Sequence, residues 1–166
     1  TALTVTVTAV ALPTATTSIA LCEGDTAAQI TATAASGHTL QWYTVATGGT
    51  ASTTAPTPST SSAGSTTYYV SQLNNSTNCE SERGAITVTV YSLPLAPTAP
   101  TTINYCQGVT PTTLAATATS GNTLQWYTVA TGGTGSLTAP TPSTATLGAT
   151  IFYVSQRNNT TGCEGA

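Results

Sequence analysis

The residues best suited to chemistry in this chain are four cysteines, two carboxylates close to the first cysteine, and one histidine. Cys22 and Cys79 are 57 positions apart, and Cys106 and Cys163 are separated by the same interval. Four cysteines allow three pairings. Disulfides persist in oxidising compartments, where they stabilise small domains with modest cores. The cysteines therefore indicate covalent cross-linking.

The chain repeats itself at an offset of 84 residues, which decides between these pairings. The string TLQWYTVATGGT at 39–50 recurs at 123–134, and TAPTPST at 54–60 recurs at 138–144. A third string, YYVSQLNNSTNCE, recurs as FYVSQRNNTTGCE and ends beside the second cysteine of each repeat. The chain is therefore a tandem array.

The repeat symmetry favours the disulfides Cys22–Cys79 and Cys106–Cys163. Closing a loop of this size stabilises a domain by roughly 4 kcal/mol in the chain-entropy model. Such a bridge is expected near the end of a domain, and the alternative is two free buried thiols per repeat. Either way, the spacing differs from that of an antibody domain, where the tryptophan follows the first cysteine more closely.

The other polar candidates are not kept between the repeats. Glu23 and Asp25 have the residue types of a carboxylate pair or a calcium ligand set, but Gln107 and Val109 stand at the equivalent positions. His38 aligns with an asparagine and is expected to be a solvated loop residue. We therefore predict no catalytic residue, no metal site and no cofactor, and expect that the chain is not an enzyme.

Two further features have structural and binding interpretations. The TGGT string lacks the lysine and helix of a phosphate site, so Gly48 and Gly49 are expected to form a hairpin turn with positive φ. Tyr43 and Tyr127 lie opposite the neighbouring tryptophans if side chains alternate, where they could bind surface polysaccharides. The alternative, which we favour, is that a sheet edge or a neighbouring repeat covers these rings.

The elements that must position these residues are short strands. In AITVTVY, Ile86, Val88 and Val90 alternate with threonines, which is the period of a half-buried strand. About seven such segments per repeat, separated by turn signals, predict an all-β fold of tandem immunoglobulin-like β-sandwich repeats that form an elongated rod. Trp42 and Trp126 are predicted to anchor the two cores.

The repeat boundaries define the expected domains. Residues 1–12 are assigned as the last strand of a preceding repeat plus a linker, because ALTVTV at 2–7 matches AITVTV at 85–90. Residues 13–91 form repeat 1, residues 92–100 a Pro-rich linker, and residues 101–166 repeat 2 without its last strand. Such linkers act as semi-rigid spacers.

Composition narrows the functional classes. Only 4% of the residues are charged, with two Lys plus Arg and a net charge of −3. This chain lacks the basic footprint of a nucleic-acid binder. No apolar run approaches the ~20 residues of a membrane span, so no direct membrane insertion is expected.

The motifs CxG, QWYTVATGGT, TAPTPST and YYVSQ, followed by a cysteine and a TVTV strand, resemble one family. The chain is similar to the Ig-like repeats of giant cell-surface proteins of Bacteroidota, including SprB-type gliding adhesins. This resemblance implies export by type IX secretion, an extracellular location at the outer-membrane exterior, and a role in adhesion and gliding. It also makes Thr26 an O-glycosylation candidate, because Asp-Thr-Ala at 25–27 fits the pattern used in that bacterial group.

We therefore predict a structural stalk or filament segment of a large surface adhesin. Its expected partners are neighbouring Ig-like repeats of the same chain, with surface polysaccharides as a further candidate. Two alternatives remain: spacer repeats in a secreted polysaccharide-degrading enzyme, and an extracellular fibre that assembles by strand complementation.

Overall fold

A computed structural model describes residues 1–5, 7 and 9–165. The chain forms two compact units, Thr1–Tyr91 and Ser92–Ala166. All regular elements of the described residues are β-strands, so the predicted all-β class is confirmed. The same residues include no helix with the length and apolar character needed to cross a bilayer.

The strands are short, and most of them belong to the first unit. Unit 1 contains β1 (Thr14–Ala15), β2 (Ser18–Cys22), β3 (Ala32–Thr33), β4 (His38–Tyr43), β5 (Gly64–Asn74) and β6 (Gly84–Tyr91). Unit 2 contains β7 (Asn122–Tyr127) and β8 (Tyr153–Asn158).

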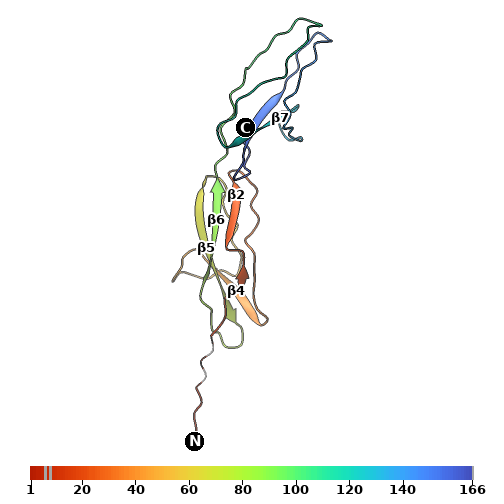
Figure 1. The fold of residues 1–166 in the computed structure, drawn as a ribbon. Coiled ribbons are helices and arrows are strands. Elements are labelled where there is room, and N and C mark those ends of the chain that lie inside the picture. The colour runs from red at the N-terminus through yellow and green to blue at the C-terminus, as the bar shows by residue number, and fades with distance from the viewer. Residues whose placement is uncertain (6, 8, 166) are drawn as a thin grey trace. The chain divides into compact units, whose positions relative to one another are not determined.

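The main sheet of unit 1 has the order β2-β6-β5-β4, and β1 and β3 form a second, two-stranded sheet. Figure 1 shows β2, β6 and β5 side by side. β6 pairs antiparallel with β5, but it pairs parallel with β2, from Ser18 opposite Thr87 to Cys22 opposite Tyr91. The last strand of the repeat is therefore central, and it is bonded directly to the first long strand.

The core of unit 1 follows from the alternation in β6. Ile86, Val88 and Val90 are buried, with exposed fractions of 0%, 1% and 6%. The threonines between them face the other side and are half-buried. Trp42, 3% exposed, packs in the same cluster as Ile86 and Val88. The predicted strand period is confirmed here, and burying these side chains is the main stabilising contribution.

Unit 2 reproduces this frame at the offset of 84. β7 pairs with β8 from Asn122 opposite Asn158 to Tyr127 opposite Tyr153, and the β4–β5 register is the same shifted by one repeat. The isolated bridge Trp126–Ser136 likewise matches Trp42–Ser52. Unit 2 therefore repeats the β4–β5 hairpin of unit 1 and the bridge from its tryptophan to the following loop.

Unit 2 has a groove of about 470 Å³ where unit 1 has β6. The groove lies between residues 101–107 and 146–152, which correspond to β2 and the start of β5. At the other terminus, Leu3, Val5 and Val7 expose 91%, 79% and 91% of their surface. Positions 6 and 8 of the predicted closing strand lie outside the described residues.

Candidate functional site

The cysteines differ in their oxidation state. Cys22 and Cys163 are disulfide-bonded. Cys79 and Cys106 carry free, exposed thiols. Each unit thus has one bonded and one free cysteine, and the predicted pairs Cys22–Cys79 and Cys106–Cys163 are not the arrangement in the structure. The presence of a disulfide indicates an oxidising environment.

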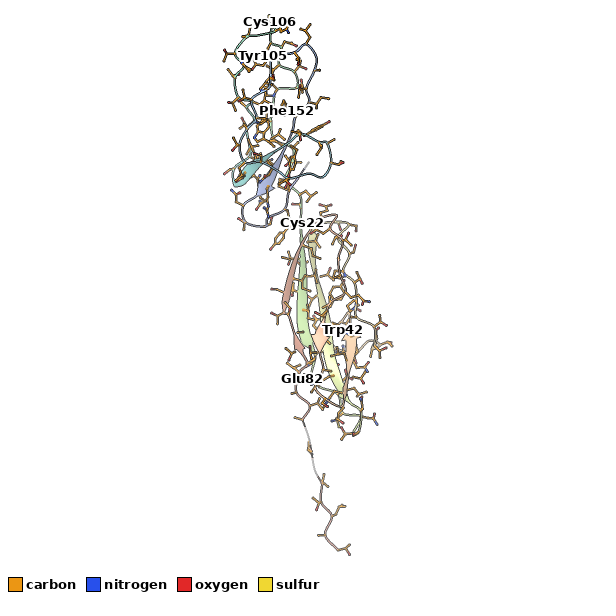
Figure 2. The ribbon with its side chains drawn as sticks, turned by 90° about the vertical axis from the view of Figure 1, so that its right-hand side faces the viewer. Cys22, Trp42, Glu82, Tyr105, Cys106 and Phe152 are labelled. Atoms are coloured by element: carbon orange, nitrogen blue, oxygen red, sulfur yellow. The ribbon has the colours of Figure 1, made fainter. Side chains whose placement is uncertain are left out.

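The strand directions explain why Cys22 and Cys79 do not pair. Cys22 lies opposite Tyr91, at one end of β6. β5 runs beyond the other end of β6 to Asn74, whose N–H donates to the carbonyl of Cys79 at 2.9 Å. The two cysteines are therefore on the order of 35 Å apart along the strands. A disulfide needs Cα atoms within about 7 Å. Figure 2 shows Cys22 and Glu82 at opposite ends of unit 1.

Each first cysteine lies in a tight turn that the backbone builds in both units. The N–H of Asp25 donates to the carbonyl of Cys22 at 3.1 Å, and the N–H of Val109 donates to that of Cys106 at 3.3 Å. In unit 1 the Asp25 carboxylate also accepts a hydrogen bond from the Cys22 N–H at 2.8 Å. The carboxylate thus closes a turn, and Thr26 beside it is exposed.

Each second cysteine follows an asparagine-centred turn. In unit 1 the Asn74 side chain accepts hydrogen bonds from the N–H groups of Ser76 and Thr77, at 2.9 and 3.0 Å. Asn158 makes the same pair of bonds in unit 2. Asn78, directly before Cys79, has a φ of 56°, and the glycine at the equivalent position has a φ of 75°. The left-handed residue turns the chain back so that Cys79 pairs with β5.

A polar cluster at the sheet edge is also repeated. The Tyr43 hydroxyl donates to the Glu80 carboxylate at 2.6 Å, and Ser71 donates to the same oxygen. The Arg83 guanidinium carbon lies 3.2 Å from the Tyr43 ring centroid, and Arg83 also donates to the carbonyl of Val45 at 2.8 Å. In unit 2, Tyr127 and Ser155 donate to Glu164.

The electrostatics of this cluster favour a fixed carboxylate. Burial raises the pKa of Tyr43, and the hydrogen bond to Glu80 raises it further. Desolvation acts to raise the pKa of Glu80, but hydrogen bonds from Ser71 and Tyr43 and the charge of Arg83 hold it below its usual value. The ionised Glu80 carboxylate, which accepts hydrogen bonds from Ser71 and Tyr43, therefore ties the segment after β5 to the sheet. A carboxyl group whose pKa is lowered in this way is not suited to proton transfer near neutral pH.

Two buried glutamines have roles that sequence reasoning missed. Gln72, 2% exposed, accepts from the N–H of Ala35 at 2.7 Å and donates to the carbonyl of Ala11 at 2.8 Å. Gln156 makes the equivalent bonds to Thr119 and Leu95. The sequence does contain a signal for this burial. Gln72 is two residues after Val70 in the same strand, and alternate residues of a strand face the same side, so its side chain faces the core. Each glutamine fastens the incoming segment to the body of its unit.

The remaining predicted residues have plain structural settings. Trp42 and Trp126 are buried, at 3% and 6% exposed. The expectation that His38 is a solvated loop residue is wrong, because His38 is the half-buried first residue of β4 and pairs with Asn74 of β5. Its ring contacts the carbonyl of Ser36 and the amide of Asn74. Among the described residues, no group of three His, Cys, Asp or Glu side chains could hold a metal ion.

The turn and tyrosine interpretations have different outcomes. Gly48 and Gly49 have φ values of 67° and 74°, so the predicted positive-φ turn is confirmed. Tyr43 is 6% exposed and lies under Arg83, which leaves little ring surface for a glycan. Tyr127 is half-buried, and it donates its hydroxyl proton to Glu164. The sheet-edge alternative for these rings is the one that the geometry supports.

Both repeats match one protein family. Residues 11–91 and residues 94–166 each match the family described as "Ig-like domain CHU_C associated". A search of curated proteins gives no match.

Proposed function

We propose, from the premise that the chain belongs to the family of Ig-like domains described as CHU_C associated, that its repeats form a load-bearing stalk segment of a large bacterial surface adhesin. Its partners are neighbouring Ig-like repeats of the same chain, and its location is the extracellular face of the cell. The work of the segment is mechanical, without catalysis.

The observation that carries this proposal is the parallel pairing of β2 with β6. When unit 1 is stretched by its two ends, the force acts on β2 at its Ser18 end and on β6 at its Tyr91 end. Because paired residues run from Ser18–Thr87 to Cys22–Tyr91, the two strands are pulled in opposite directions along one ladder. All hydrogen bonds of the ladder then stretch together, and none can break alone.

Contacts around this ladder support the same role. Ile19 and Leu21 of β2 pack against the core cluster that contains Ile86 and Val88, so sliding the strand also costs buried apolar contact. Before β2, the Gln72 side chain donates a hydrogen bond to the carbonyl of Ala11. The chain segment that leads into β2 is therefore also attached to β5. The composition also suits an exposed extracellular segment, because two Arg and no Lys leave few cleavage sites for trypsin-like proteases.

The direction of pulling tests the load-bearing part of the proposal. Unit 1 is attached through residues 11 and 91 in one experiment and through residues 23 and 91 in another. In the second geometry both handles lie at one end, because the Glu23 N–H donates to the carbonyl of Tyr91 at 2.8 Å. We expect a clearly higher rupture force for the first pair at one loading rate, since the second peels β2 away bond by bond. Equal forces would remove the mechanical argument.

The adhesin part is tested on intact cells of the source organism. An antibody to residues 13–91 is used for immunogold microscopy and for a blot of the parent protein. Labelled surface fibres with a very large parent support the stalk, and with it the roles in adhesion and gliding and the type IX export route. A modest secreted band without surface label would instead support the alternative of spacer repeats in a polysaccharide-degrading enzyme.

A second candidate, fibre assembly by strand complementation, is favoured by the groove in unit 2. The groove occupies the position of β6, and the exposed Leu3, Val5 and Val7 repeat the apolar pattern of that strand. A strand from a second copy would fit between the flanking segments. Light scattering over a range of concentrations tests it: growth with concentration that Val5→Lys abolishes supports exchange, and a constant monomer mass contradicts it.

A further inference from the structure

Two overlapping Asn-x-Ser/Thr sequences lie at the end of β5, and two more lie at the end of β8. The asparagines are Asn74 and Asn75 in unit 1, and Asn158 and Asn159 in unit 2. Such a sequence is an acceptor for N-linked glycans when it lies on the surface of an exported protein. Accessibility therefore decides which of these asparagines is suited to modification.

The first asparagine of each pair is committed to the turn itself. The Asn74 side-chain oxygen accepts two backbone hydrogen bonds, and its amide nitrogen lies 3.3 Å from Nε2 of His38. Asn158 accepts the same pair of backbone bonds, and both asparagines are half-buried. A sugar on the Asn74 nitrogen would displace the His38 ring, so the fold disfavours modification there.

The second asparagine of each pair is exposed and presents its amide nitrogen to solvent. The side-chain oxygen of Asn75 accepts from the hydroxyl of Thr39 at 2.8 Å, and that of Asn159 accepts from Thr123 at 2.6 Å. The backbone N–H of each donates to a glycine carbonyl, at 3.0 and 2.9 Å. Among the described residues, neither side-chain nitrogen has a hydrogen-bond partner. Both asparagines are thus fixed through every polar group except Nδ2.

We propose that Asn75 and Asn159 are acceptors of N-linked glycans, one on each repeat. The bonds from Thr39 and Thr123 are compatible with modification, because a glycan replaces only one hydrogen of Nδ2 and leaves the amide oxygen in place. Only 4% of the residues are charged, so hydrophilic sugars on each repeat would add to its solubility. This inference goes beyond the stalk function, and it holds equally for spacer repeats of an exported protein.

The donor is a sugar activated by a diphosphate carrier, such as a nucleotide sugar, and a separate glycosyltransferase performs the transfer. Nδ2 of Asn75 attacks the anomeric carbon of the sugar, so that a C–N bond forms and the C–O bond to the diphosphate breaks. The carrier leaves with the bonding electron pair, and Nδ2 loses one proton to a base of the transferase. No oxidant or reductant takes part.

A matched pair of variants tests the proposal in the full chain, produced in the source organism beside the wild type. Thr77→Ala removes the hydroxyl residue of the Asn75 sequence, whereas Ser76→Ala removes only the one that belongs to Asn74. Both replaced residues are exposed, and circular dichroism checks that the variants are folded. Each purified protein is digested and examined by tandem mass spectrometry under conditions that preserve the bond between sugar and asparagine.

We expect the wild-type peptides with Asn75 and Asn159 to carry the mass of at least one sugar residue. The glycan on Asn75 should be lost in Thr77→Ala and retained in Ser76→Ala. Asn159 should keep its glycan in both variants, which makes it the internal control for export and modification. Unmodified Asn75 and Asn159 in the wild type, a glycan on Asn74 instead, or a glycan on Asn75 that persists in Thr77→Ala would overturn the proposal.

Discussion

Replacing Gln72 with leucine removes the fastening of the incoming segment while keeping the side chain of similar size. The Gln72 amide spans two loops, through the N–H of Ala35 at 2.7 Å and the carbonyl of Ala11 at 2.8 Å. Leucine can make neither bond, so both backbone groups lose their partner at a site where the side chain itself is 2% exposed. The variant should therefore unfold more easily.

The magnitude follows from the two bonds. A typical intramolecular hydrogen bond contributes a net 0.5–1.5 kcal/mol, and a buried group left unsatisfied costs about 1–3 kcal/mol. Ala11 and Ala35 are exposed residues, so water can reach part of each backbone group. We therefore expect a loss of about 2 kcal/mol in the free energy of unfolding of unit 1. For a domain of this size, the melting temperature would fall by about 8–16 °C.

The two tryptophans make the assay specific to one unit. Trp42 is in unit 1 and Trp126 is in unit 2, and both are buried. In a Trp126→Phe background, tryptophan fluorescence reports only on unit 1 during urea unfolding. Gln29→Leu serves as the control, because Gln29 is exposed and has one long hydrogen bond of 3.4 Å. The reasoning is refuted if both glutamine variants shift the urea midpoint equally.

Three other outcomes are expected for unit 1. Gly49→Ala should destabilise unit 1 more than Gly48→Ala does. Both glycines have positive φ, but only a Cβ at position 49 would approach the Val45 side chain, at 2.8 Å. The difference between the melting temperatures of the two variants measures this effect. Val88→Ala should cost about 2 kcal/mol in urea unfolding, because Val88 is 1% exposed in the core and an empty volume would remain. The depressed pKa of Glu80 contributes stability that is present above the ordinary carboxyl pKa and is lost as the pH falls through the lowered value. Between pH 6 and pH 3 the urea midpoint of Glu80→Gln should therefore fall less than that of the wild-type chain.

The repeated local patterns were readable from the sequence because they depend on neighbouring residues. Alternation in β6 placed Ile86 and Val88 inside, and the TGGT string located the turn at Gly48 and Gly49. The family resemblance pointed to Ig-like repeats, which the family match supports. Each of these inferences needed only a short window of sequence.

The cysteine arrangement could not be read in this way. A spacing of 57 residues gives the length of a loop, but not the end of the domain at which each cysteine lies. That depends on strand direction, because β2 is parallel to β6 and β5 is antiparallel to it. β2 and β5 therefore end at opposite sides of the sheet, and the cysteines that follow them are separated. The parallel pairing of β2 with β6 joins segments far apart in the chain, so no short stretch of sequence predicts it.

The same long-range pairing governs how a repeat acquires its structure during synthesis. β2 gains its neighbour only when β6 is available, and the paired residues Ser18 and Thr87 are 69 positions apart. Until β6 is synthesised, β5 can pair only with β4, so the β4–β5 hairpin is the one part of this sheet that can form. Loops of this length slow folding, because the closure entropy is lost before the contact forms. A growing array therefore folds in whole-repeat steps, with one unfinished repeat at a time at its newest end.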